Sequence, residues 1–243
     1  MYYQRNSITS IITYRVYKKP YFYYIWHMEL TLNENILLVS DLHVNHKKLC
    51  TSYEEHFDRT RKYKTIEEMN DDIVKQWNSI VSQDDIVIFL GDFTLGTPGS
   101  QLLEVFGDYY TNKLNFKHMY MIRGNHDYNL FKKIYPVKDI FPNITLVKDY
   151  ILLNHNDKNY LIQHFNYDET VNEHDGTTGD PSVLNHYLQA GTKLDYLVHG
   201  HTHEFNKTNV LQNHNCNFIE NNVSWEAWYR PVRLNELAKT IDE

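Results

Sequence analysis

The sequence has little cysteine. Among 243 residues only Cys50 and Cys216 occur, far apart and outside any C-x-x-C pair. This spacing excludes a disulfide framework and a zinc ribbon, which both need several closely spaced thiols. Two isolated cysteines are typical of a reducing compartment, so we expect a cytoplasmic protein.

Long hydrophobic runs and an excess of positive charge are also missing. No segment approaches the roughly 20 apolar residues that cross a bilayer, so we expect no membrane partner. Residues 1–27 mix tyrosine with arginine and lysine, and no small-residue cleavage site follows, which argues against a signal peptide. The net charge of -7 argues against a protein that coats nucleic acid. It does not exclude a nuclease, because metal ions in a site reverse the local charge.

The sequence contains no repeat, low-complexity block or linker that would divide it. With 42% hydrophobic residues, it can bury a sizeable core. We predict a single domain over residues 28–243, because Met28 stands just before the first convincing strand. Residues 1–27 form an N-terminal extension of uncertain role, which is either an appendage or a structural part of the domain.

Short apolar runs alternate with segments of helical periodicity, which predicts an α/β domain. The clearest helix spans 65–81 and opens with a capping box, in which Thr65 caps the helix and Glu68 follows three residues later. Its apolar residues recur at helical spacing. The predicted strands cover 35–41, 85–92, 117–127, 195–203 and 217–225, with a hairpin over 146–165 and two further helices over 98–111 and 182–190.

Four of these strands end on aspartate, asparagine or histidine, and a fifth such residue ends the hairpin. Ligands of open α/β sheets gather beyond the carboxyl ends of the strands. We therefore expect these side chains to converge on one site. They are Asp41 and His43, Asp92, Asn125 and His126, His164, and His201 and His203.

Each of these motifs also has an ordinary structural explanation. Asp41 can cap a helix, Gly91-Asp92 and Gly124-Asn125 are common turn pairs, and an isolated His164 is more often structural than a ligand. His201 and His203 are the better metal signal, because alternate residues of an extended segment point the same way. The joint occurrence of all the motifs at strand ends favours a shared site.

The expected ligands are oxygen and imidazole, with no thiolate. This set suits Mn, Fe, Zn or Ni and argues against a structural zinc site. Even seven of these eight side chains are too many ligands for one ion that also binds substrate, and they suit two divalent ions bridged by a carboxylate. Two metals roughly 3.5–4 Å apart clamp an in-line displacement at phosphorus.

The ordered motifs resemble the calcineurin-like metallophosphoesterase superfamily, in particular a small bacterial and phage branch. They read Asp41-Leu42-His43, Gly91-Asp92, Gly124-Asn125-His126-Asp127, His164 and Gly200-His201-Thr202-His203. The resemblance runs from about residue 35 to 235. It implies a four-layer α/β/β/α sandwich with mixed sheets and a dinuclear metal site at the carboxyl ends of the strands, in a bacterial or phage-infected cell.

The resemblance also implies a role for each matching residue. Asp41, His43 and His203 would hold the first ion, Asp92 would bridge both, and the second would be held by Asn125, His164 and His201. His126 would be catalytic, donating to the substrate phosphate, while a metal-bridging hydroxide attacks. We expect manganese, with Fe, Zn or Ni as alternatives.

Two positions that differ from the superfamily pattern, and two arginines, bear on the identity of the substrate. Leu95 stands where protein phosphatases of the superfamily have a second Asp, and Asn166 stands where many relatives have Pro. Arg123 resembles a phosphate-binding arginine and is equally explained as a surface residue. Arg61 either holds a phosphate or is a solvated loop charge.

We therefore expect a metal-dependent phosphoesterase that hydrolyses a phosphodiester of a nucleotide or small molecule. A phosphomonoesterase or a nuclease acting on nucleic acid is the alternative within enzymes. A nucleotide-binding decoy or a scaffold without turnover is the alternative outside them. Loop 166–181, which includes His174 and Asp175, is long enough to act as a lid. The tyrosines that either stack a base or serve packing are Tyr53, Tyr109, Tyr110, Tyr128 and Tyr167.

Overall fold

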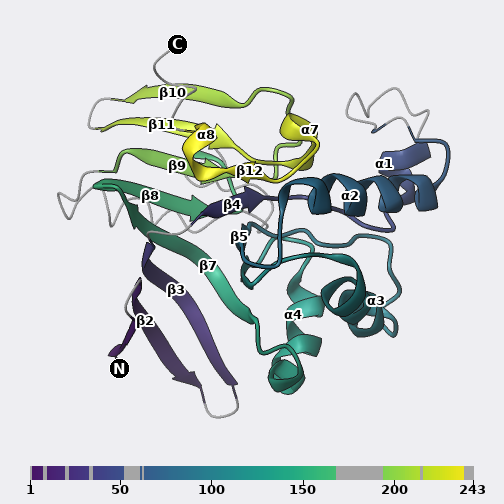
Figure 1. The fold of residues 1–243 in the computed structure, drawn as a ribbon, viewed down its shortest axis with the longest axis horizontal. Helices are drawn as coiled ribbons and strands as arrows, with labels where there is room; N and C mark the ends of the chain where they lie inside the picture. The colour runs from purple at the N-terminus through teal and green to yellow at the C-terminus, as the bar shows by residue number, and fades with distance from the viewer. Residues whose placement is uncertain are drawn as a thin grey trace.

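The computed structural model describes residues 2–7, 10–19, 22–32, 35–51, 61, 63–167, 194–213 and 216–237 (Figure 1). The strands are β1 Tyr2–Ser7, β2 Ser10–Lys19, β3 Phe22–Leu32, β4 Ile36–Val39, β5 Ile86–Phe89, β6 His118–Ile122, β7 Ile144–His155, β8 Lys158–Gln163, β9 Tyr196–His199, β10 Thr208–Asn213, β11 Cys216–Asn222 and β12 Val232–Arg233. The helices are α1 Lys47–Thr51, α2 Ile66–Ile80, α3 Leu102–Asp108, α4 Tyr128–Ile134, α7 Trp225–Trp228 and α8 Leu234–Leu237, with a π-helical turn at Tyr109–Lys113 and a 3-10 helix at Tyr135–Ile140.

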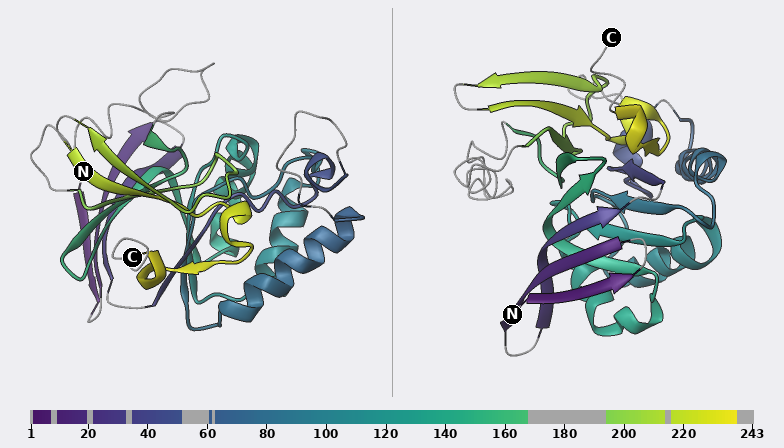
Figure 2. Two further views of the ribbon diagram at one scale, coloured as in Figure 1. Left: turned by 90° about the horizontal axis from the view of Figure 1, so that it is seen from above. Right: turned by 60° about the vertical axis from the view of Figure 1, so that its left-hand side comes forward.

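The described strands form one mixed sheet that curls into two halves (Figures 1 and 2). Its order is β10-β11-β9-β8-β7-β6-β5-β4-β12. The long strand β7 joins the halves, because its first part pairs with β6 and its second part pairs with β8. Parallel pairing of β4, β5 and β6 brings the carboxyl ends of these three strands to one edge.

One face of the first half packs against helices α2, α3 and α4. Alternate strand residues such as Leu37, Val87 and Met121 point to this side, where they meet Ile73 and Trp77 of α2. All five are essentially inaccessible to solvent. Complete burial of an aliphatic side chain of this size contributes about 1.5–3 kcal/mol, so this layer fixes the position of the sheet against the helices.

The opposite face of the first half packs against the second half of the sheet. Leu38 and Ile88 belong to the first half, Ile162 and Val198 belong to β8 and β9, and all four lie in one buried cluster. Because successive strand residues point to opposite faces, β4 and β5 are buried on both sides. This explains why their sequences are continuous apolar runs.

Val223, which follows β11, links the ends of strands from the two halves. Its N–H donates to the carbonyl of His199 over 2.8 Å, and its carbonyl accepts from the N–H of Ser40 over 2.9 Å. The loop after β4 and the loop after β9 are therefore held beside each other. These two loops begin with Asp41 and Gly200.

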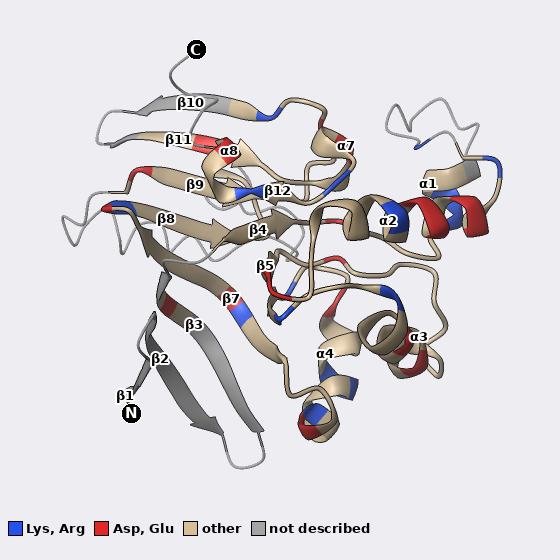
Figure 3. Ribbon diagram, viewed as in Figure 1, with Lys and Arg blue, Asp and Glu red and all other residues tan. Residues whose placement is uncertain are grey.

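Helix α2 begins as its sequence predicts. The Thr65 hydroxyl accepts from the N–H of Glu68 over 3.1 Å, and the Glu68 carboxylate accepts from the N–H of Lys64 over 2.9 Å. The acidic residues of its first turn interact favourably with the positive end of the helix dipole and so stabilise the helix. Acidic residues on α2 and α3 and basic residues on α4 lie on the same side of the molecule (Figure 3).

The predicted α/β sandwich with mixed sheets is confirmed. Its two sheet layers are the two halves of one curled sheet. The predicted helix 182–190 and most of loop 166–181, including His174 and Asp175, lie outside the described residues. Strand β3 runs across the predicted boundary at residue 28 and pairs in parallel with β7. Within the described part of the chain, no helix has the length and apolar character needed to cross a membrane.

Candidate metal centre

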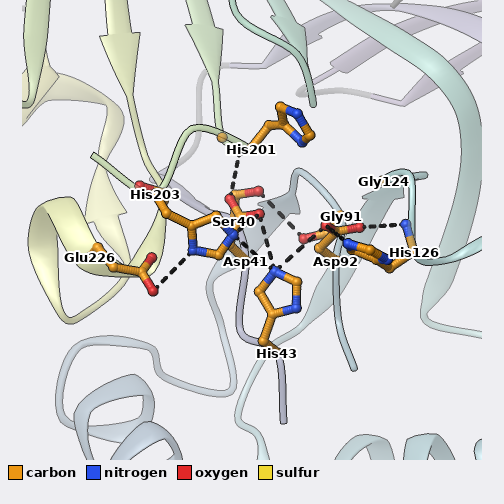
Figure 4. A network of polar contacts seen from close by, with 12 residues as sticks. Ser40, Asp41, His43, Gly91, Asp92, Gly124, His126, His201, His203 and Glu226 are labelled. Atoms are coloured by element: carbon orange, nitrogen blue, oxygen red, sulfur yellow. Dashed lines mark hydrogen bonds and ion pairs between the residues drawn. The ribbon is translucent and has the colours of Figure 1, made fainter. Parts of the chain in front are cut away.

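The loops after β4, β5, β8 and β9 place two groups of potential ligands side by side. Figure 4 shows Asp41, His43 and His203 beside Asp92 and His201. One group comprises Asp41, His43 and His203, and the other comprises Asp92, His164 and His201. Within each group, one ligand atom from every residue lies within 4.8 Å of the others. We call them the first and the second ligand group.

The first ligand group is tightly packed. His43 Nε2 and His203 Nε2 lie 3.1 Å apart, and each lies 3.6 Å from Asp41 Oδ1. Asp41 Oδ1 is buried without a hydrogen-bond partner among the described residues. A buried carboxylate oxygen facing two imidazole nitrogens is the donor set that a divalent cation satisfies.

Asn125 adds a fourth donor, an amide oxygen, to the second ligand group. Asn125 Oδ1 lies 2.9 Å from His164 Nε2, and His201 Nδ1 lies 3.2 Å from the same nitrogen. His164 Nε2 also lies 3.5 Å from Asp92 Oδ2. The structure therefore brings together all four side chains that the resemblance assigns to the second ion.

Asp92 lies between the two groups. Its Oδ2 is 3.6 Å from His43 Nε2 and 3.5 Å from His164 Nε2. Its Oδ1 accepts a hydrogen bond from the N–H of His126 over 2.9 Å. A carboxylate with imidazoles of both groups beside one oxygen has the position of a bridging ligand.

Five of the ligand residues have left-handed backbone conformations, with φ of 60° at Asp41, 47° at His43, 58° at Asp92, 67° at His201 and 53° at His203. Such values are uncommon for residues other than glycine and are tolerated best by Asp, Asn and His. Observed strain of this kind clusters at functional sites. The expectation that His201 and His203 alternate along an extended segment is corrected, since a kinked backbone sends one to each group.

Two glycines permit the close approach of the loops. A Cβ on Gly124 would overlap Asp92, and a Cβ on Gly200 would overlap the side chains of Ser40 and Asp41. The glycines at these positions are thus required by the space that the ligands occupy.

Three buried carboxyl groups lie close together at the site. Burial and the nearby Asp127 and Asp41 raise the pKa of Asp92 well above its usual range. Burial would also raise the pKa of Asp41, but His203 and His43 hold it well below its usual range. Burial lowers the pKa of His43 to about 3, so its imidazole is neutral and free to act as a ligand. Divalent cations would offset the concentrated negative charge.

Asp127 ties the β5 and β6 loops together. Its carboxylate accepts from the N–H groups of Asp92 over 2.6 Å, Phe93 over 3.1 Å and Gly124 over 3.0 Å. The sequence motif Gly124-Asn125-His126-Asp127 gives no sign that Asp127 accepts these three backbone hydrogen bonds. Three N–H donors around one buried carboxylate fix the positions of Asp92 and Asn125.

The structure corrects the prediction that Arg61 is a solvated loop charge. Its side chain is fully buried, and Nε donates to Glu226 over 2.8 Å, so it is not a solvated loop charge. Nη1 donates to the carbonyl of Leu42 over 2.5 Å, and Nη2 donates to that of Asp41. Each guanidinium nitrogen bonds a protein oxygen, so the expected phosphate contact is not supported. Glu226 was missed because its partner lies 165 residues away in the sequence.

His126 lies at the accessible side of the centre. The side chain of His126 is 37% exposed, and its Nε2 lies 3.9 Å from Asp92 Oδ2. Burial lowers the pKa of His126. Arg123, which immediately precedes Gly124, is half-buried. His199 lies outside both ligand groups, with Nδ1 2.8 Å from the carbonyl of Gly200.

The tyrosines have different surroundings. Tyr109 is buried in the helix-side core, Tyr110 packs against Phe141, and Tyr167 packs against Phe218. Tyr128 is exposed, and Tyr53 lies outside the described residues.

A family model described as calcineurin-like phosphoesterase matches residues 34–205, which contain every residue of both ligand groups. The chain belongs to the calcineurin-like phosphoesterase family. This calcineurin-like phosphoesterase has possible metal-binding residues, and its fold and ligand order agree with the resemblance that the sequence indicated.

Two relatives and one solved structure extend the comparison. The uncharacterised protein MJ1445 of Methanocaldococcus jannaschii is 35% identical over 95 residues, which cover 38% of this chain and 46% of that protein. The Gene 66 protein of Mycobacterium phage L5 is 25% identical over 218 residues, which cover 86% and 94%. The crystal structure of protein AQ665 of unknown function from Aquifex aeolicus has a TM-score of 0.55 and 18% identity, covering 86% of this chain and 100% of that one. The last similarity concerns the fold alone.

Proposed function

We propose that this calcineurin-like phosphoesterase hydrolyses a phosphodiester of a nucleotide or small molecule with two divalent ions, manganese being the expected metal. The position of Asp92 carries the proposal, because one carboxylate oxygen lies within 3.6 Å of an imidazole of each ligand group. Asp41, His43 and His203 would hold one ion, and Asn125, His164 and His201 would hold the other. When bound, such an ion pair activates water and offsets charge on the phosphoryl oxygens.

His126 would act on the substrate directly. Its backbone N–H is fixed by Asp92, while its exposed imidazole is free to reach a non-bridging oxygen of the phosphate. Because burial lowers its pKa, the ring is neutral near pH 7 and donates one N–H hydrogen bond. Protonation of the leaving alkoxide would come from the imidazolium form of His126, which reverts to neutral imidazole as it gives up the proton.

The arginines favour a diester over a monoester. Arg61 is committed to Glu226, which leaves Arg123 as the arginine adjoining the β6 ligand loop in the described chain. A phosphodiester carries one negative charge, whereas a phosphomonoester carries nearly two at pH 7. One arginine and one neutral imidazole beside the ions suit the monoanion.

A substrate panel with added Mn(II) tests the proposal. It comprises bis-p-nitrophenyl phosphate, p-nitrophenyl phosphate, cyclic nucleotides and single-stranded DNA. We expect turnover of bis-p-nitrophenyl phosphate above that of p-nitrophenyl phosphate. Preferred hydrolysis of the monoester, or of DNA, would replace the proposal with a phosphomonoesterase or a nuclease. Metal-loaded protein that turns over no substrate, with trapped nucleotide, would favour a decoy.

A further inference from the structure

A buried ion pair lies directly behind the first ligand group. Glu226, on α7, is almost inaccessible to solvent, and its Oε1 lies 3.1 Å from His203 Nδ1 (Figure 4). The same oxygen accepts from Arg61 Nε over 2.8 Å. The carboxylate therefore contacts the side of the imidazole opposite to Nε2, the atom that faces Asp41 and His43.

Arg61 connects this carboxylate to the loop after β4. Its guanidinium donates to the carbonyls of Asp41 and Leu42 as well as to Glu226. One planar side chain thus touches the backbone of one ligand and the support of another. Arginine presents its donors in a rigid fork, so their relative positions are fixed together.

The position of the carboxylate suits a ligand role for His203. Glu226 Oε1 lies 3.1 Å from Nδ1. A carboxylate oxygen this close to Nδ1 favours a proton on that nitrogen. With the proton on Nδ1, the lone pair of His203 is on Nε2, where a metal ion would bind.

Stability alone does not explain such a pair. Replacing a buried ion pair with well-packed apolar residues is often neutral or stabilising, because two charges must be removed from water. Here both members converge on the first ligand group. A carboxylate that accepts from the second nitrogen of a ligating histidine fixes its orientation and raises its basicity.

We propose that Arg61 and Glu226 are positioning residues for the ion bound by Asp41, His43 and His203. This inference rests on the proposed dinuclear function. Glu226 selects the tautomer and orientation of His203, and Arg61 holds Glu226 and the Asp41 backbone in one frame. Neither residue contacts the substrate.

Metal binding by the full chain tests the inference without recourse to activity. The apoprotein is titrated with Mn²⁺ by calorimetry, and bound metal is counted by mass spectrometry. Glu226→Ala should weaken binding of one of the two ions by about 10- to 100-fold and leave the other unchanged. Glu226→Gln should lose less, because its amide oxygen can still accept from Nδ1–H.

Two arginine variants separate charge from geometry. Arg61→Lys keeps the positive charge but loses the fork, so it should also weaken one ion selectively. Arg61→Met is measured alone and together with Glu226→Ala. The double variant should lose less metal affinity than the sum of the losses in the two single variants, because Arg61 and Glu226 act as a unit. Glu236→Gln is the matched control, since Glu236 and Arg230 form a hydrogen-bonded pair that includes neither a ligand residue nor Glu226 or Arg61.

The outcomes distinguish this inference from the proposed function. A wild-type protein that binds two ions, together with Glu226→Ala and Glu226→Gln proteins that bind both with unchanged affinity, overturns the positioning role alone. Equal weakening of both ions in the folded variants also overturns it. A wild-type protein that binds no divalent ion overturns the positioning role and the dinuclear function together.

Discussion

The two ligand groups share Asp92 but are supported by different means. His203 of the first group contacts an ionised side chain, Glu226, which is itself paired with Arg61. His164 of the second group contacts a backbone carbonyl, that of Leu90, over 2.8 Å through Nδ1. The first support depends on two side chains, whereas the second is a main-chain carbonyl of the residue that follows β5.

Each group has two buried residues and one half-buried residue, His203 in the first and His201 in the second. The second group also adjoins the half-buried Asn125 and the exposed His126. Substrate can therefore approach beside the second group more readily than through the first. We expect the first group to retain its ion more firmly and the second group to lie beside the substrate, and variants can test this division.

The largest effect is expected from Asp92→Asn, which would remove the feature that the groups share. A neutral amide is a weaker ligand and cannot bridge two cations as a carboxylate does, so affinity for both ions should fall by more than about 100-fold. Metal content after dialysis measures the loss. Asp108→Asn, which alters a solvent-exposed ion pair on α3, serves as the control. Loss of only one ion would show that Asp92 belongs to a single group.

His126→Gln should separate chemistry from metal binding. We expect both ions to remain and kcat to fall by about 10²- to 10⁴-fold, because the proton donor to the leaving group is removed. Metal counts and steady-state kinetics measured on one preparation check this result. His118→Gln, at the opposite end of β6, is the matched control. A collapse of metal content would instead make His126 part of the second group.

Much of this centre was predictable because each ligand follows a short apolar run. Strands β4, β5, β6 and β9 are buried on both faces, so their sequences mark their ends clearly. Support from Glu226 was not predictable, since no local pattern relates it to Arg61 across 165 residues. The left-handed backbone at the ligands was equally hidden, because Asp and His occupy such positions without a glycine signal.

Parts of the fold escaped prediction for local reasons. Helix α3 begins at Leu102 rather than near Pro98, because Gly99 and Ser100 continue the turn. Strand β10 is rich in polar residues and lacks the apolar alternation of its neighbours. The curling of the sheet depends on β7 pairing with different strands along its length, which no single segment encodes.

Arg123→Gln should have a moderate effect on the substrate side only. If its guanidinium binds the phosphate, KM for a diester should rise about tenfold while both ions stay bound. Lys133→Gln, an exposed cation on α4, should leave KM unchanged. Kinetics with bis-p-nitrophenyl phosphate decide the matter. An unchanged KM in Arg123→Gln would identify Arg123 as a surface residue.

The smallest effect concerns the ion pair remote from the centre. Hydrogen bonds from Arg230 lower the pKa of Glu236 below its ordinary value of 4.5. Its stabilisation is therefore present above pH 4.5 and is lost as the pH falls through the lowered pKa. Glu236→Gln should cost less than about 1 kcal/mol at pH 7, and less still in acid. Urea unfolding at both pH values measures this difference, and a larger cost in acid would contradict it.

The central claim is that one carboxylate joins two metal positions, and electron paramagnetic resonance of the Mn(II)-loaded protein tests it most directly. Two Mn(II) ions bridged through Asp92 are expected to give an exchange-coupled spectrum at two ions per chain in the wild type. That spectrum should be lost in Asp92→Asn. A wild-type spectrum of isolated Mn(II) at full loading would contradict the account.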